Sequence, residues 1–200
     1  MLSDAGDRRR AFVQSAGRAL TPFPHAWFDR PAPDVARDLI GSRLEVGPLA
    51  ARVVETEAYT SDDPASHSFG GPRPRNRAMF GPAGLAYVYR SYGIHWCLNV
   101  VCRSGDAVLL RALEPLAGLE VMARRRGTEA PRALCSGPGK IGQAFGLDAA
   151  ADGADILRFH PAPRGPVVTG PRIGITRATD RPWRFGSEGS AFLSRRFPGT

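Results

Sequence analysis

Two carboxylates and an aromatic ring alternate within one short stretch of the chain, residues 53–59. If this stretch is a β-strand, successive side chains point to opposite sides, and one face carries Val53, Glu55, Glu57 and Tyr59. A buried carboxylate needs a partner, so a strand face of this kind is poor core material. Alternation alone favours a solvated outer face, and it is the rest of the chain that favours a functional site.

Further polar and aromatic groups suggest a pocket shared with this strand. Apart from Tyr59, the tyrosines lie in one later segment, at Tyr87, Tyr89 and Tyr92. Two otherwise apolar strands follow, and each is interrupted by one polar side chain, Asn99 in the first and Arg111 in the second. Together with the imidazole of His67, these carboxylate, aromatic, amide and guanidinium groups predict one binding pocket.

The charge balance indicates a polyanionic partner. The chain has 200 residues and a net charge of +8, and Lys140 is its only lysine, so arginine supplies almost all of the positive charge. Arginine suits phosphate because its fork binds two oxygens at once. A protein that is merely basic is the alternative. The length fits one domain, residues 21–200, preceded by a basic and partly ordered arm, residues 1–20.

Cysteine usage and hydropathy bear on the compartment. The three cysteines are irregularly spaced and form neither a disulfide framework nor a CxxC pair, which predicts a reducing environment. No apolar run has the length of a membrane span, and the N-terminus lacks the apolar region of a secretory signal. We expect a cytoplasmic protein without a membrane partner, associated with the nucleoid if the host is bacterial.

Glu57 is the candidate general base, because an ionised carboxylate within hydrogen-bond reach can take a proton from water. Arg111 lies in a strand that otherwise favours burial, so its guanidinium must be paired. It could form a structural salt bridge with Glu55 or Glu114. It could instead keep Glu57 ionised and help to hold its water, and the sequence pattern leaves both interpretations open.

Asn99 and His67 are candidate ligand contacts. Alternation does not require Asn99 to be buried; if it faces the pocket, its amide can accept or reject particular base edges. His67 follows an acidic loop, but the chain has no HExxH motif and no Cys/His pair at ligand spacing. We therefore expect a hydrogen bond from His67 to a ligand, and neither a metal nor another cofactor.

Two further motifs bear on nucleic-acid binding. Tyrosines in strands are usually core residues, but Tyr92 stands beside Gly93 at the turn of an expected hairpin, where an aromatic could act as a wedge between stacked bases. Residues 136–140 resemble a phosphate loop only superficially, because Ile141 replaces the required Ser or Thr. A main-chain contact to phosphate and a plain helix start are both open there.

Periodicity and turn residues predict the elements that position these groups. We expect a helix over 34–40, strands over 43–46 and 49–59, a long loop over 60–84, a hairpin of strands 85–90 and 94–101, and a strand over 107–113. Pro115 is expected to open a helix that runs to about residue 126, with Leu116, Leu119 and Met122 on its core side. A second helix over 133–145 is broken or started at 136–139. Short strands are expected near 156, 172–176, 183–185 and 191–194.

The chain resembles the alkyladenine (3-methyladenine) DNA glycosylase family. The likeness rests on VETEAY (54–59), ASHS (65–68), PRNRAMF (74–80), YVYRSYG (87–93), LLRALEP (109–115) and CSGPGK (135–140). It extends from about residue 27 to 197 and is weakest over 147–170. The resemblance implies an α+β fold, a single mixed domain around a curved antiparallel sheet with flanking helices. It also implies a protruding hairpin and the flipping of a damaged nucleotide into a pocket.

Carried over position by position, the resemblance assigns the site. Glu57 would activate water for attack on C1′, and Arg111 and the main-chain carbonyl of Ile173 would help to hold that water. Tyr59, His67 and Tyr89 would line the pocket, and Asn99 would discourage normal guanine through its exocyclic amino group. Tyr92 would fill the gap in the duplex. Further DNA contacts are expected from Tyr87, Arg75, Arg77 and Lys140.

The resemblance implies a monomeric enzyme that excises alkylated purines, hypoxanthine or ethenoadenine from double-stranded DNA. We expect no lyase activity, because Lys140 belongs to a separate segment and the pocket offers no lysine for a Schiff base. Two other classes remain open from the residues. One is a non-enzymatic nucleic-acid-binding module in which Glu57 is structural. The other is a metal-dependent hydrolase that uses Glu55, Glu57, Asp62 and His67.

Overall fold

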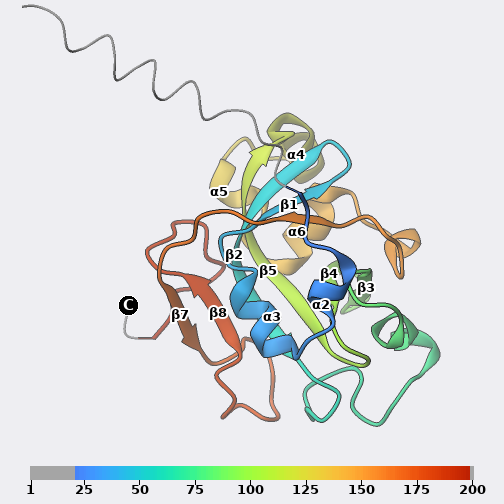
Figure 1. Cartoon of the computed structure of the whole chain (residues 1–200). Coiled ribbons are helices and arrows are strands. Elements are labelled where there is room, and N and C mark those ends of the chain that lie inside the picture. Colours follow the sequence, from blue (N-terminus) through green and yellow to red (C-terminus); the bar gives the residue numbers. More distant parts are fainter. Residues whose placement is uncertain (1–20, 199–200) are drawn as a thin grey trace, which may run out of the picture.

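Strand β2 (Leu49–Tyr59) lies at the centre of an eight-stranded antiparallel sheet (Figure 1). The computed structural model describes residues 21–198, so the predicted arm over 1–20 lies outside the described residues. The other strands are β1 (Arg43–Val46), β3 (Ala86–Ser91), β4 (His95–Val101), β5 (Ala107–Ala117), β6 (Arg158–His160), β7 (Val167–Gly170) and β8 (Arg184–Ser187). They follow the order β3-β4-β5-β2-β1-β6, and β8 pairs with both β2 and β7. Because β1 and β8 pair with different parts of β2, one long strand joins the two halves of the sheet.

Short helices surround this sheet. They are α2 (His25–Phe28), α3 (Ala32–Asp38), α4 (Leu119–Arg126), α5 (Pro131–Leu134) and α6 (Pro138–Phe145), with 3₁₀ turns η1 (Pro74–Phe80) and η2 (Ala149–Ala151). Helix α3 crosses β2 and β5 (Figure 1), and the Thr56 hydroxyl donates a hydrogen bond to the Ala36 carbonyl at 2.8 Å. Helix α6 approaches β4 so closely that a Cβ at Gly142 would lie 2.0 Å from the Trp96 carbonyl oxygen. Helices α3 and α6 pack on the same face of the curled sheet, because both contribute to the main core cluster.

The two faces of the sheet have different chemistry. The helix-covered face is apolar, and Ala58, Val88, Leu98 and Leu110 from four strands belong to the main core cluster. The opposite face carries a cross-strand row in which each residue is paired with the next, namely Tyr87, Asn99, Leu109 and Glu57. Sheet register thus brings an aromatic, an amide and a carboxylate together from segments far apart in the sequence.

A local irregularity of β2 corrects one prediction. Val53 was expected on the same face as Glu55 and Glu57, but it lies in the main core cluster. The register between β2 and β5 shifts on both sides of Glu55, so the alternation changes face between Val53 and Glu55. The bulge allows the first half of β2 to bury one alternate set of residues and the second half to bury the other.

Pro115 also departs from its prediction. It does not open a helix but lies within β5, and α4 begins only at Leu119. Strand β4 pairs with β5 only as far as Leu109, and a register shift lies beside the Pro115 pair, so the missing N–H of Pro115 is tolerated. Leu116 and Leu119 are consequently exposed rather than on the core side, whereas Met122 is buried.

Most of the other predicted elements are present in the structure, and a few are not. The α+β class, the bounds of β1 and β2, the hairpin and the break before α6 are confirmed, and the first predicted helix lies two residues earlier as α3. The loop over 60–84 contains η1, which the sequence analysis did not predict. Residues 172–176 and 191–194 are not strands in the structure.

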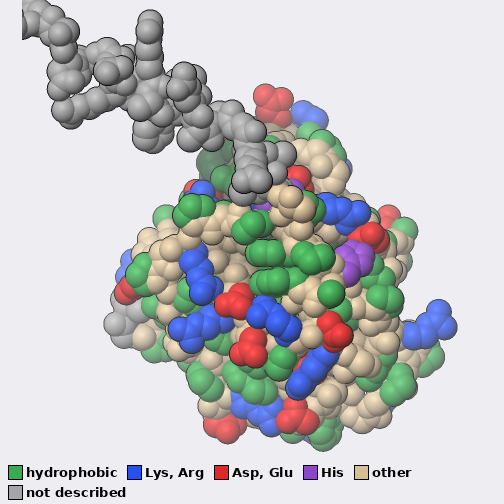
Figure 2. Space-filling model, viewed as in Figure 1, with side chains coloured by type: hydrophobic (Ala, Val, Ile, Leu, Met, Phe, Trp, Pro, Cys, Tyr) green, Lys and Arg blue, Asp and Glu red, His purple; other side chains and the backbone are tan. Residues whose placement is uncertain are grey.

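The view of the α2 and α3 side shows acidic, basic and hydrophobic side chains interspersed (Figure 2). The positive charge of residues 21–198 is therefore not gathered into one continuous basic surface on this side. Within residues 21–198, none of the helices combines the length and the apolar character needed to cross a membrane.

Candidate active site

A pocket of about 360 Å³ opens on the polar face of the sheet. Its wall combines residues from β2, β3, β4 and β5 with residues from the loops that follow β2 and β7, and from the start of α6. Tyr59, His67, Tyr89, Asn99 and Arg111 all contribute to it, as does Ile173. The volume lies in the range of small-molecule pockets. The structure therefore brings the predicted substrate-binding residues together.

Glu57 is fully buried and receives a different donor on each oxygen. The main-chain N–H of Ile173 donates to Oε1 at 2.7 Å, and the Tyr59 hydroxyl donates to Oε2 at 2.8 Å. Burial raises the pKa of Glu57, while the positive charge of Arg111 and these two hydrogen bonds act in the opposite direction. Glu57 is thus a stronger base than an ordinary carboxylate.

Arg111 lies beside both Glu55 and Glu57, so the structural ion pair and the contact with the candidate base are present together. Its Nη1 lies 3.5 Å from Oε2 of Glu57, and its Nε lies 3.6 Å from Oε1 of Glu55. The third candidate partner, Glu114, pairs instead with Arg52 at 3.0 Å. Only 12% of the Arg111 side chain is exposed, so its charge acts on both carboxylates with little screening.

Three rings form an aromatic wall of the pocket. Tyr87 and Tyr89 stack with centroids 5.7 Å apart and planes at 29°, and His67 packs edge-on against Tyr89 at 4.5 Å. Nδ1 of His67 lies 2.8 Å from the Tyr87 hydroxyl. Partial removal from water lowers the pKa of His67, and Arg75 acts in the same direction. A neutral imidazole at pH 7 has one donor and one acceptor nitrogen for its neighbours.

Asn76 is a positioning residue that sequence analysis named only as part of a motif. It is fully buried, and its Nδ2 donates to the His67 carbonyl at 2.7 Å, while its Oδ1 accepts from the Arg73 N–H at 2.6 Å. These bonds fix the loop that carries His67 against η1. The sequence did contain a signal for this role, because Asn76 is a neutral amide in a segment that also holds Arg73, Arg75 and Arg77.

Asn99 is buried and faces the pocket. Its Nδ2 donates to the Tyr87 carbonyl at 3.0 Å and lies 3.4 Å from that of Cys97. These main-chain acceptors orient the amide and engage its donor end. Asn99 therefore has a fixed orientation in the pocket, although the sequence had left both its burial and its direction open.

The hairpin tip is a strained turn. Tyr92 has a φ of 50° and Gly93 a φ of 71°, and the Ile94 N–H donates to the Ser91 carbonyl at 3.1 Å. Two successive positive φ values are typical of a type I′ turn, which tyrosine rarely adopts. Tyr92 is 90% exposed and Ile94 66% exposed, so two apolar side chains project from the tip. The predicted exposure of Tyr92 is confirmed, and Ile94 was missed.

Of the remaining predicted residues, Ile173 lines the pocket and three predicted DNA contacts lie outside its wall. Ile173 donates its N–H to Glu57, and the contact of its carbonyl with the attacking water stays a prediction. Arg75 borders a neighbouring groove beside Tyr87 and Tyr89. Arg77 and Lys140 do not line the pocket, and Lys140 Nζ donates to the Ser136 hydroxyl at 3.1 Å.

The acidic residues of the alternative metal site are engaged elsewhere. Glu55 accepts hydrogen bonds from Arg184 and from Ser194, and Asp62 accepts one from Thr60. Among residues 21–198, no three His, Cys, Asp or Glu side chains are grouped as a metal ion would require.

Comparison with known proteins places the chain among the DNA glycosylases, which are hydrolases of N-glycosyl bonds that act in base-excision repair of damaged DNA. A family model described as "Methylpurine-DNA glycosylase (MPG)" matches residues 26–191. Because the match covers most of the sequence, the chain belongs to the methylpurine-DNA glycosylase family.

Three relatives share the name "Putative 3-methyladenine DNA glycosylase". The protein of Agrobacterium fabrum is 58% identical over 179 residues, covering 87% of this chain and 93% of its own. That of Rhodopseudomonas palustris is 54% identical over 189 residues, covering 90% and 92%. That of Nitrosospira multiformis is 55% identical over 182 residues, covering 87% and 94%.

Proposed function

We propose that this chain excises alkylated or deaminated purines from double-stranded DNA with a water molecule activated by Glu57. The substrates we propose are 3-methyladenine, 7-methylguanine, hypoxanthine and ethenoadenine. The observation that carries the proposal is the buried carboxylate of Glu57 beside an aromatic pocket, with Arg111 at 3.5 Å. Family membership and the names of the relatives support the same reaction class.

The proposed reaction is a hydrolysis at the anomeric carbon. The water oxygen forms a bond to C1′ as the bond from C1′ to the purine nitrogen breaks, and the purine leaves with the electron pair of that bond. Glu57 takes the proton of the water, for which its raised pKa suits it. Arg111 stabilises the ionised form of Glu57 before the proton is transferred. The product is an abasic site.

Recognition in this proposal depends on the aromatic wall. Flipping a nucleotide costs a few kcal/mol, and least for a damaged or poorly paired base. Stacking on an aromatic side chain returns roughly 1–3 kcal/mol per base. A cationic base such as 3-methyladenine or 7-methylguanine gains a further cation–π attraction from Tyr59, Tyr89 or Tyr87. Asn99, held in place by the Tyr87 carbonyl, would discourage normal guanine sterically, by leaving no room for its exocyclic amino group.

The remaining proposed contacts are with the duplex. Tyr92 at the hairpin tip would fill the gap left by the flipped nucleotide, as apolar wedges do between base steps. Arg75, Arg77 and Lys140 would contact DNA around the pocket, whereas the buried Tyr87 would meet DNA only through the flipped base, because it belongs to the pocket wall. Lys140, the only lysine of the chain, lies outside the pocket wall, so we propose a monofunctional enzyme without lyase activity. That the enzyme is monomeric and cytoplasmic is a separate part of the proposal.

The test is base release from a duplex oligonucleotide that carries one hypoxanthine or ethenoadenine, and from methylated DNA, with EDTA present. Abasic sites are revealed by alkali. Wild type should release the base and Glu57→Gln should not, because glutamine cannot accept the proton. Glu114→Gln is the matched control, since it removes a carboxylate of the same sheet that pairs with Arg52 outside the pocket.

Three outcomes would contradict parts of the proposal. Equal release by wild type and Glu57→Gln would remove Glu57 from catalysis. Absence of release from every substrate, with DNA binding intact, would favour the non-enzymatic binding module. Strand scission without alkali that disappears in Lys140→Ala would contradict the monofunctional assignment.

A further inference from the structure

Arg172 and Asp63 form a buried ion pair beside the candidate active site. Both side chains are fully removed from solvent. Arg172 Nη1 donates to Oδ2 of Asp63, and Nη2 donates to Oδ1 at 3.2 Å, so the pair is bidentate. Asp63 belongs to the loop after β2, and Arg172 belongs to the loop after β7. The pair therefore joins two loops that both contribute residues to the pocket wall.

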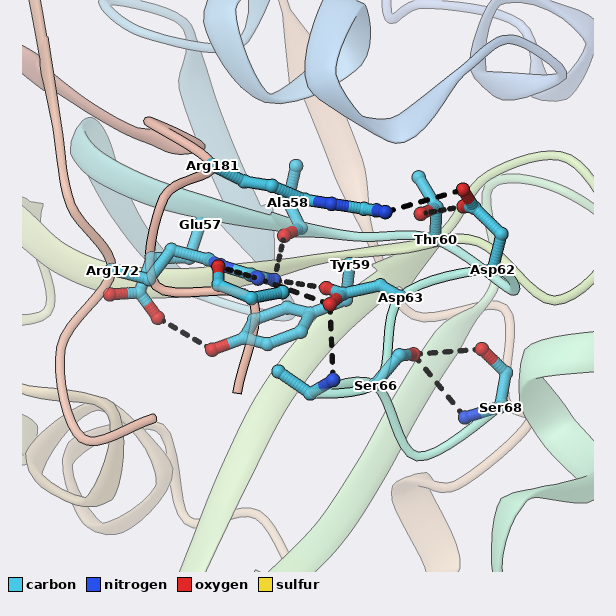
Figure 3. A network of polar contacts seen from close by, with 12 residues as sticks. Glu57, Ala58, Tyr59, Thr60, Asp62, Asp63, Ser66, Ser68, Arg172 and Arg181 are labelled. Atoms are coloured by element: carbon cyan, nitrogen blue, oxygen red, sulfur yellow. Dashed lines mark hydrogen bonds and ion pairs between the residues drawn. The ribbon is translucent and has the colours of Figure 1, made fainter. Parts of the chain in front are cut away.

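The guanidinium of Arg172 contacts the segment that carries Glu57. It lies over the Tyr59 ring, with its central carbon 4.7 Å from the ring centroid (Figure 3). Nη1 also donates to the Ala58 carbonyl at 3.0 Å. These contacts fix the ring whose hydroxyl donates to Glu57.

The same side chain fixes the second donor to Glu57. Ile173, whose N–H donates to Glu57, directly follows Arg172, so anchoring the side chain of Arg172 also anchors the backbone at Ile173. Nη2 of Arg172 lies 3.3 Å from the Ala178 carbonyl and ties down the far side of the loop. Asp63 in turn accepts a hydrogen bond from the Ala65 N–H at 3.0 Å, two residues before His67.

We propose that Arg172 and Asp63 are a positioning pair that holds the Ile173 amide and the Tyr59 hydroxyl on the two oxygens of Glu57, and so keeps Glu57 ionised for catalysis. The inference deepens, and in its catalytic part rests on, the proposed glycosylase activity. Neither member of the pair touches the reacting atoms in this proposal. Their effect is transmitted through the two neutral donors.

The groups around Glu57 make the role of the pair distinguishable from a simple charge effect. Glu57 faces Arg111 from β5, Glu55 and Tyr59 from β2, Tyr89 from β3 and the amide of Ile173. The charge of Arg172 is directed to Asp63 rather than to Glu57. A lysine at position 172 would keep the charge but lose the fork that anchors both loops. Arg172→Lys should therefore behave like the loss of the pair.

The first measurement is a titration of the carboxyl carbons of ¹³C-labelled glutamate by NMR in the full chain, with the Glu57 resonance assigned by its absence in Glu57→Gln. In Arg172→Lys and in Asp63→Asn, the midpoint of the Glu57 titration should rise by about one pH unit or more. At a given pH, this shift lowers the ratio of ionised to protonated Glu57 about tenfold. Leu44→Ala is the control, because it removes core side-chain volume in β1 without touching the pocket. Its Glu57 midpoint should match wild type.

The second measurement is the pH profile of single-turnover excision with DNA in saturating amount. The acid limb should move to higher pH in both pair variants by the same amount as the Glu57 midpoint, with DNA affinity unchanged. An unchanged Glu57 midpoint in a folded pair variant would overturn the inference, as would a moved midpoint with an unmoved acid limb. The titration requires no substrate. An inactive wild type would therefore refute the proposed function, while the titration would still show whether the Arg172–Asp63 pair controls the ionisation of Glu57.

Discussion

Glu55 and Glu57 are two residues apart on β2, point to the same face, are both fully buried and share Arg111, yet their other partners differ. Glu55 accepts hydrogen bonds from Arg184 Nε at 2.8 Å and from the N–H and hydroxyl of Ser194 at 2.6 and 2.8 Å. Glu57 receives two neutral donors and lies beside the pocket.

The comparison shows how neighbouring carboxylates of one strand acquire different roles. A second buried guanidinium and a serine saturate Glu55, so it joins β8 and the following segment to β2. Among residues 21–198, Glu57 has only its share of Arg111 as a positive partner, so burial outweighs the stabilisation of its charge and raises its pKa. Proton uptake is therefore favoured at Glu57, the residue next to the pocket.

The largest expected effect is on stability, from Glu55→Gln. This change leaves Arg184 buried without its anionic partner, and breaking a buried pair typically costs about 3–5 kcal/mol of unfolding free energy. Glu114→Gln breaks a partly exposed pair with Arg52 and should cost only about 0–1 kcal/mol. Urea denaturation of the two variants measures the difference. Equal losses would remove the structural distinction between Glu55 and an ordinary surface carboxylate.

Tyr59→Phe should weaken the ionised state of Glu57 without unfolding the sheet. Loss of a hydrogen bond to a charged group amounts to about 1.5–3 kcal/mol, which corresponds to an upward shift of the Glu57 pKa by about one to two units. The acid limb of the excision rate should move to higher pH by that amount. A pH profile of single-turnover excision is the measurement, and an unmoved limb would show that the Tyr59 hydroxyl does not act on Glu57.

Glu57→Gln should change how stability depends on pH. The pKa of Glu57 is higher in the folded than in the unfolded chain. Its contribution to stability is therefore fully present at pH values below its pKa in the unfolded chain, and is lost as pH rises through its pKa in the folded chain. Wild type should thus lose stability relative to Glu57→Gln as pH rises above about 4.5, by at most about 1.4 kcal/mol per pH unit. Denaturant unfolding from pH 4 to 8 tests the sign, and the opposite slope would contradict the raised pKa.

The smallest expected effect is at the hairpin tip. Tyr92→Gly removes a side chain from a backbone with positive φ and should stabilise the fold by about 0.5–1 kcal/mol, while excision from duplex DNA decreases. Thermal unfolding and excision kinetics measure the two effects. Gain of stability with unchanged excision would show that Tyr92 is not needed for base release.

Local signals in the sequence predicted the elements that depend on neighbouring residues. Alternation and turn glycines determined β2 and the hairpin, because their pattern and their turns lie within a few residues. Val53 was placed on the wrong face because a bulge depends on what each half of a strand buries. Pro115 was misread because its tolerance within β5 depends on where β4 stops pairing.

The partners of the site residues were harder to predict than the residues themselves. Glu57 and Arg111 stood out as polar groups in strands that favour burial, and the structure brings them together. Arg172, Asp63 and Ser194 gave no such signal, because their roles arise from pairing across more than a hundred positions. Residues 172–176 were read as a strand, although they form the loop that presents an amide to Glu57.

The sequence distance between β2 and its partners has a consequence for biosynthesis. Ile173 is 116 positions after Glu57, and Ser194 is 139 positions after Glu55. Because the ribosome makes the chain from its N-terminus, both carboxylates emerge long before these hydrogen-bond donors. They must stay hydrated on a growing chain, since burial without a partner is costly. Strand β2 can therefore gain these contacts only after residues 172–194 have been made, and a nascent chain cannot complete this site before then.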